Sequence, residues 1–204
     1  MKSIEVFWQE FRDHELESHY IRRSRRRQEP QLKGTVSFGE TAEECDAMVE
    51  KILRGECGAV ITSMQAWQES ARQLPNVDDY RILLDHRGEP RAVLRSTGLH
   101  MVSLWQMKGE YTYAADHPAP VPEKKKEASG RKRREEKRDE KKEQLEKQRL
   151  QAAMTSSLAL WQAAARPRLV RECTLRGVPF SMDMLMVVDL FSVAYAEGMD
   201  AEEE

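Results

Sequence analysis

The sequence predicts an α+β fold, and three features support this prediction: a β-hairpin, two amphipathic helices before it, and an apolar strand near the end of the chain. In the hairpin, residues 80–84 (YRILL) show the alternation of a strand with one buried face. Residues 85–90 (DHRGEP) are typical of a turn, in which Gly88 can adopt a positive φ. Residues 92–94 then return as the partner strand.

The two helices before the hairpin are predicted from their spacing and their caps. The first covers residues 1–20 and has apolar residues at the i, i+3, i+4, i+7 positions of one face: Ile4, Phe7, Trp8 and Phe11. The second begins at a capping box, in which the Thr41 hydroxyl and the Glu44 carboxylate satisfy each other's free amide groups. Gly55 lies at the position where that helix is expected to end.

Further elements follow from the spacing of apolar residues. Residues 59–62 are expected to form a short strand, and residues 99–105 a second one. Residues 155–165 have helical spacing, and Pro167 is expected to end or kink that helix. Residues 184–193 form a largely apolar closing strand.

Length and composition indicate one domain of modest size with a solvated part. The chain has 204 residues, of which 33% are charged and 40% are hydrophobic. No apolar run is long enough to span a membrane, and acidic residues near the N-terminus argue against a signal or transit peptide. The three cysteines are far apart and lack the spacing of zinc ligands. We therefore expect an intracellular monomer, in the cytoplasm or nucleus, without a metal or cofactor.

Basic and acidic residues are strongly segregated, although the net charge is only −2. The segment Glu123–Arg149 contains 13 Lys or Arg and 8 Asp or Glu, which leaves 20 basic and 27 acidic residues elsewhere. A second basic patch covers residues 22–27, and residues 197–204 form an acidic tail. Two basic arms on an acidic body predict an attraction for phosphate groups.

The segment 117–151 is predicted to be a charged insertion, either helical or disordered. Prolines at its start favour an extended entry. From Arg131 onward the charged residues have helical spacing, but no apolar face accompanies them. Two interpretations stay open. The segment is a solvated spur, or it is a contact for RNA or ribonucleoprotein or a nuclear localisation signal.

Short blocks in order along the chain resemble the ASCH (activating signal cointegrator homology) domains. They are Phe7–Phe11, Ser37–Gly39, Leu53–Gly55, the hairpin, Tyr111–Ala114, Ser157–Trp161 and Phe180–Tyr195. The resemblance implies a PUA-like small β-barrel flanked by helices. It divides the chain into an N-terminal helix (1–20), a basic loop (21–33), the barrel (34–116), the insertion (117–151), a C-terminal helix with the closing strand (152–196), and the tail (197–204).

The resemblance also implies where catalysis would take place. Some ASCH proteins are amidohydrolases of acetylated cytidine nucleosides, and their site combines a lysine, a strand threonine and a later glutamate. In this chain Cys57 occupies the lysine position and Val60 the threonine position, while Glu110 matches the glutamate. We therefore predict an inactive copy, with Glu110 and Cys57 as the remaining catalytic candidates. Cys57 is either a replacement nucleophile or a small buried apolar residue.

Other ASCH proteins are thought to bind RNA, which gives the basic and aromatic residues a predicted role. The candidates for nucleic-acid contacts are Arg22, Arg23, Arg25, Arg26, Arg27, Lys124, Lys125, Lys126, Arg131, Lys132, Arg133, Arg134 and Trp67. Trp67 either stacks on a base or fills the emptied site. Three functions remain: an RNA-associated binding module, a scaffold subunit of a ribonucleoprotein or regulatory complex, and a divergent amidohydrolase. The first is favoured, with RNA, ribonucleoprotein or protein partners.

Overall fold

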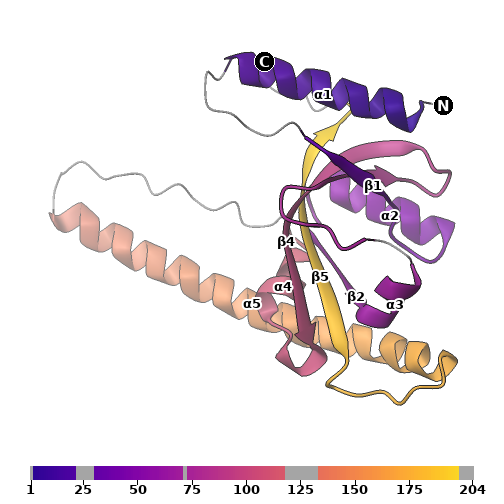
Figure 1. Cartoon of the computed structure of the whole chain (residues 1–204). Coiled ribbons are helices and arrows are strands. Elements are labelled where there is room, and N and C mark those ends of the chain that lie inside the picture. Colours follow the sequence, from indigo (N-terminus) through magenta and orange to yellow (C-terminus); the bar gives the residue numbers. More distant parts are fainter. Residues whose placement is uncertain (1, 22–29, 71–72, 118–132, 198–204) are drawn as a thin grey trace.

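One five-stranded sheet organises the fold, and the helices lie around it (Figure 1). The structure is a computed structural model that describes residues 2–21, 30–70, 73–117 and 133–197. Its elements are α1 (Ile4–Ile21), β1 (Leu32–Val36), α2 (Ala42–Leu53), β2 (Ala59–Ser63), α3 (Met64–Glu69), β3 (Tyr80–Leu84), β4 (Pro90–Ser103), η1 (Leu104–Gln106), α4 (Gly109–Ala114), α5 (Arg133–Leu175) and β5 (Leu185–Ala196). The predicted α+β class is confirmed.

The sheet has the strand order β1-β3-β4-β5-β2. β4 and β5 pair antiparallel along most of their length, from Ala92 opposite Ala196 to Ser103 opposite Leu185. β2 adds antiparallel to β5, and β1 adds parallel to β3. The segments 92–94 and 99–105, predicted as separate strands, therefore belong mostly to one long strand, β4, whose register shifts between Ser96 and Gly98.

The predicted closure of the barrel is wrong, because the described strands form an open sheet. β1 and β2 stand at its two edges and do not pair with each other. Both edge strands are five residues long. Helix α2, which lies between them in the chain, buries Val49 and Ile52 in a cluster with Val36 of β1 and Phe191 of β5. Helix packing therefore covers this side of the sheet where a closed barrel would need strand pairing.

β1 is a strand that the sequence analysis missed. Its first residues, Leu32 and Lys33, fall in the expected basic loop 21–33, and residues 22–29 of that loop lie outside the described residues. Lys33, Gly34 and Thr35 are exposed, and only Val36 is buried. The strand therefore lacks the alternation that marks a half-buried strand in a sequence.

Three apolar clusters join the helices to the sheet. Phe7 and Phe11 of α1 are fully buried against Ile82 of β3. The α2 cluster covers another part of the sheet, and a third cluster includes Tyr111 of α4 and Leu169 of α5. Each predicted apolar helix face is thus used for packing, which is where most of the stability of an amphipathic helix originates.

The caps of α2 agree with the sequence in all but one bond. The Glu44 amide donates to the Thr41 hydroxyl at 3.2 Å, and Gly55 has a φ of 71°, as expected after a helix end. The Glu44 carboxylate, however, accepts from the Glu40 amide at 2.9 Å, and not from the Thr41 amide that a capping box requires. The reciprocal half of the predicted box is therefore displaced by one residue.

Helix α5 runs without interruption from Arg133 to Leu175, so residues of the expected insertion and the predicted helix 155–165 share one element. The helix does not end at Pro167. A proline removes only one backbone N–H from the helix ladder. Beyond it, Leu169 and Cys173 are buried, and their packing holds the last turns in place.

The first half of α5 projects beyond the sheet (Figure 1). Residues 144–153 are all exposed. Contact with the body begins near Met154, because a Cβ added to Gly109 of α4 would lie 2.4 Å from the Met154 carbonyl oxygen. None of the described helices combines the length and the apolar character needed to cross a membrane.

A buried ion pair crosses the middle of the sheet. Arg81 of β3 donates to both carboxylate oxygens of Asp189 of β5, at 2.6 and 2.9 Å, and to the Ser96 hydroxyl of β4 at 3.2 Å. The exposed fractions of the Arg81 and Asp189 side chains are 7% and 1%. Burial of a bidentate pair in one geometry fixes the relative position of three neighbouring strands.

We predict that Asp189→Asn lowers the free energy of unfolding by about 3 kcal/mol, because the Arg81 cation stays buried without its counter-charge. Urea unfolding followed by circular dichroism measures this loss. Asp78→Asn is the matched control. Asp78 pairs with Arg95 at 2.9 Å, but its side chain is 64% exposed, so this change should cost less than about 1 kcal/mol. Equal effects of the two substitutions would contradict a special role for the buried pair.

Pro167→Ala should raise the free energy of unfolding by about 1–3 kcal/mol, since proline in a helix interior is roughly 3 kcal/mol less favourable than alanine. Pro167 is exposed, so the substitution removes little packing. The same unfolding measurement applies, with Arg168→Ala as an exposed neighbouring control that should change stability by less than about 0.5 kcal/mol. Destabilisation by Pro167→Ala would show that the proline conformation is required.

Candidate functional site

Cys57, at the position of the family lysine, is a buried thiol. Its exposed fraction is 4%, and its Sγ donates to the Ala59 carbonyl at 3.3 Å. Burial raises the pKa of the Cys57 thiol above its ordinary value, and this outweighs the hydrogen bond to Ala59, which lowers it. A thiol that stays protonated and covered is a poor nucleophile. These properties match the apolar interpretation of Cys57.

The other two family positions do not complete a catalytic group around Cys57. Val60 lies on β2 opposite Asp189 of β5 and packs at the edge of the apolar cluster under α2. Glu110 lies in the first turn of α4, where its side chain is 53% exposed and pairs with Lys108 at 3.4 Å. Within the part of the chain that the structure describes, no hydrogen bond or ion pair joins Cys57 to Glu110.

Lys51 is a charged neighbour of Cys57 that the sequence analysis missed. Its ammonium pairs with Asp116 at 2.6 Å and donates to the Ala115 carbonyl at 3.3 Å. The positive charge of Lys51 lowers the pKa of the Cys57 thiol, although the effect of burial is larger. Lys51 joins the last turn of α2 to the end of α4. The sequence signal that could have identified Lys51 is its place as the basic residue in the last turn of α2.

Most of the predicted nucleic-acid contacts fall outside the described residues. This holds for Arg22 to Arg27, for Lys124 to Lys126, and for Arg131 and Lys132. Arg133 and Arg134 form the start of α5. Trp67 lies in α3 with an exposed fraction of 7%, so in this structure its ring is not open to a stacking base. Two roles were considered for Trp67, stacking on a base and filling the emptied site, and this placement is the one expected for filling the site.

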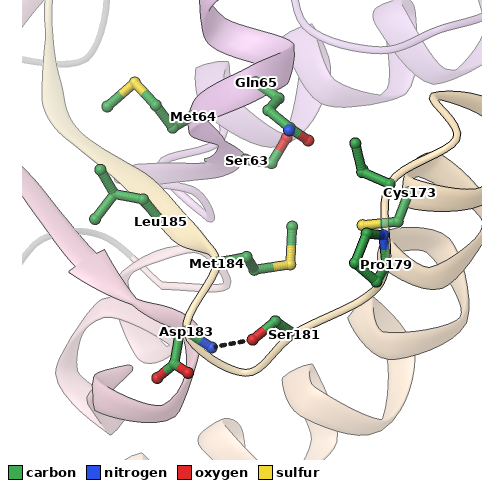
Figure 2. Close-up of a pocket in the computed structure, with 10 residues that line it drawn as sticks. Ser63, Met64, Gln65, Cys173, Pro179, Ser181, Asp183, Met184 and Leu185 are labelled. Carbon is green, nitrogen blue, oxygen red and sulfur yellow. Dashed lines mark hydrogen bonds between the residues drawn. The ribbon is translucent and has the colours of Figure 1, made fainter.

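A first cavity, of about 420 Å³, opens between the start of α3, the end of α5 and the segment before β5 (Figure 2). Its lining residues are Ser63, Met64, Gln65, Cys173, Val178, Pro179, Ser181, Asp183, Met184 and Leu185. Two methionines and the buried Cys173 thiol give it a largely apolar wall. Figure 2 shows the Ser181 hydroxyl accepting a hydrogen bond from the Asp183 amide.

The Ser63 hydroxyl in this cavity is already engaged on both sides. It accepts from the Ala66 amide at 3.1 Å, which caps α3, and it donates to the Glu172 carboxylate of α5. Glu172 in turn pairs with Arg176 at 3.0 Å, and Arg176 donates to Glu69 of α3 at 2.6 Å. This chain of bonds ties α3 to the end of α5. It is a structural connection, in which the Glu172 carboxylate is shared between Ser63 and Arg176.

A second cavity, of about 320 Å³, lies between α5, η1 and the segment before β5. It is lined by Leu104, Ala159, Trp161, Gln162, Ala163, Ala165, Arg166, Leu169, Phe180 and Met182. Aromatic and aliphatic side chains dominate this wall, with one amide and one guanidinium among them. Among the described residues, no group of three or more His, Cys, Asp or Glu could hold a metal ion.

The comparisons with known proteins agree with the fold described above. The family model of the ASCH domain matches residues 34–115. The fold is shared with the crystal structure of an ASCH domain from Lactobacillus crispatus JV V101, at 20% identity and a TM-score of 0.54, over 91% of this chain and 95% of that one. It is shared equally with protein EF3133 from Enterococcus faecalis V583, at 19% identity and a TM-score of 0.55, over 93% and 91%.

The open sheet with its surrounding helices therefore defines an ASCH-type α+β fold. The ASCH domain model matches residues 34–115, so the resemblance predicted from the sequence blocks is confirmed. No curated protein matches the sequence.

We expect no rapid reaction of the native protein with a thiol reagent such as DTNB at pH 8, because all three cysteines are buried. After unfolding in guanidinium, three thiols per chain should react. Absorbance at the wavelength of the released thiolate measures the number of reactive thiols in the native and in the unfolded protein. A Cys57→Ala variant shows which part of the reaction belongs to Cys57. Fast native labelling of a thiol that disappears in Cys57→Ala would restore Cys57 as a candidate nucleophile.

Proposed function

We propose that this ASCH-domain protein is a non-catalytic, RNA-associated binding module. The observation that carries the proposal is the separation of charge along the chain. The segment Glu123–Arg149 has a net charge of +5, from 13 basic and 8 acidic residues, whereas the 20 basic and 27 acidic residues elsewhere give −7. A locally basic segment on an acidic protein is suited to a polyanion and poorly suited to acidic protein surfaces.

The structure supports the proposal through the position of α5. Residues 144–153 are exposed, so this part of the helix is accessible to a long partner. Leu145 and Leu150 are 49% and 39% exposed, and no other large apolar side chain lies between residues 144 and 153. A protein partner that binds a helix normally needs apolar anchors, whereas a nucleic-acid backbone needs charge.

The non-catalytic part of the proposal is supported by the family positions. Cys57 is buried and protonated, Val60 carries no reactive group, and Glu110 points to no described partner except Lys108. A binding role needs none of these groups. An intracellular location, in the cytoplasm or nucleus, is part of the proposal, since that is where RNA is available.

Fluorescence anisotropy with a labelled single-stranded RNA of 20 nucleotides tests the proposal in the full chain. We expect log Kd to rise linearly with log salt concentration, with a slope of about 0.7 for each phosphate contacted. A variant with Gln at the seven basic positions 124–126 and 131–134 should bind more weakly and have a shallower slope. Lys33→Gln with Lys108→Gln, which removes two exposed charges of the body, should leave the slope nearly unchanged.

Two other outcomes would redirect the proposal. Failure of the full chain to bind RNA at low salt would favour the scaffold function, with protein partners to be found by affinity purification. Hydrolysis of an acetylated cytidine nucleoside that is lost in Glu110→Gln would establish the amidohydrolase instead. The control for that assay is Glu56→Gln, which changes an exposed glutamate paired only with Arg54 among the described residues.

A further inference from the structure

The second cavity contains polar groups that the fold leaves without partners. In the described part of the chain, the Trp161 indole N–H, the Gln162 amide and the Arg166 guanidinium make no hydrogen bond or ion pair. The first cavity differs, because its Ser63 hydroxyl is bonded on both sides. These groups are half-buried or exposed, so they are accessible to a ligand, and a few polar groups in a largely apolar wall are what orients a ligand in its site.

The walls of the second cavity suit a flat aromatic ring. The Arg166 guanidinium lies over the Phe180 ring, 5.7 Å from its centroid, so the two already form one cation–π pair. Trp161 adds a second aromatic surface, and Leu104 and Leu169 add buried aliphatic ones. The volume of about 320 Å³ is at the small end of ligand sites, which favours one base over a larger ligand.

An exposed tryptophan is attached to the same wall. Trp105 of η1 is 58% exposed, and its backbone N–H donates to the carbonyl of Met182 at 3.0 Å. Met182 lines the cavity and is itself 42% exposed. Large apolar side chains that remain exposed beside a cavity are typical of binding surfaces.

One arginine, Arg166, lines this cavity, and the helix that carries it is basic in this region. From residue 152 to residue 171 the sequence of α5 contains three arginines and no acidic residue. Among the described residues, Arg166, Arg168 and Arg171 form no ion pair, whereas Arg176, directly after the end of the helix, pairs with Glu69 and Glu172. Arginines that pair with no carboxylate of the protein are available to bind phosphate groups.

We propose that the second cavity binds one unstacked base of single-stranded RNA. This inference rests on the proposed function and assigns it a specific site. The base enters between Trp161 and the Arg166–Phe180 pair, and the Gln162 amide donates to or accepts from its edge. Arg168, seven residues after Trp161 and on the same side of α5, contacts the phosphate of a neighbouring nucleotide. The RNA strand then continues toward the basic first half of α5.

Photocrosslinking locates the base in the full chain. A 12-nucleotide oligouridine with one 5-iodouridine is irradiated with the protein, and the adduct is mapped by mass spectrometry. We expect adducts at Trp161, Phe180 or Trp105. Adducts confined to residues 22–27 or 124–134, with none in the cavity walls, would overturn the inference.

Affinity measurements with cavity variants give a second readout. Gln162→Ala and Ala163→Trp change α5 residues that line the cavity, and Ala163 is exposed, so its replacement by tryptophan obstructs the cavity without a core substitution. Each should weaken oligouridine binding about fivefold or more, because one base contributes a large share of single-strand affinity. Neither should alter binding of an abasic RNA of equal length. Arg166→Gln should weaken binding, while Arg87→Gln, the same change at an exposed hairpin position, should not.

The outcomes separate this inference from the proposed function. Salt-dependent oligouridine binding that is unchanged in Gln162→Ala and Ala163→Trp would reject the cavity and keep the RNA-binding module. Absence of oligouridine binding by the native chain would reject both. Thermal unfolding by circular dichroism confirms that each variant is folded before its affinity is compared.

Discussion

The interior position of β5, between β4 and the edge strand β2, is the constraint on which the other elements depend. β5 pairs with β4 on one side and with β2 on the other, yet it comes after α5, well beyond the residues 34–115 that match the ASCH domain. The matched segment therefore lacks a central strand of its own sheet. The ion pair of Asp189 with Arg81 adds a register requirement, since a slip by one residue would turn the carboxylate to the opposite face.

Sequence analysis predicted the elements whose signals are local. The hairpin and the caps of α2 depend on residues a few positions apart, and Tyr80–Leu84 and Gly55 lie where they were expected. β1 and the open sheet were not predictable in this way, because strand pairing joins residues far apart in the chain. Of the two outcomes predicted for Pro167, the helix end is wrong for the same reason: buried residues beyond Pro167 hold the helix, and burial is a tertiary property.

The candidate site shows a similar division. The resemblance predicted from the sequence places Cys57 at a lysine position of the hydrolytic ASCH proteins, but the choice between a nucleophile and a core residue required the burial of Cys57. The second cavity could not be foreseen, because its walls come from η1, α5 and the segment before β5. Trp161 and Leu169 have the helical spacing of core residues, and no local pattern indicates that the Gln162 amide between them stays unpaired.

The continuity of α5 has a consequence for how its outer half can change. Because Arg133 and Leu175 belong to one helix, each residue before Met154 has a fixed direction and distance relative to the packed half. One inserted residue would advance everything before it by about 1.5 Å and rotate it by about 100°. Substitutions in residues 144–153 are therefore nearly neutral for the fold. An inserted or deleted residue in this segment, in contrast, changes the direction in which every side chain before it points. Length, more than composition, is the property of this segment that is tied to the domain.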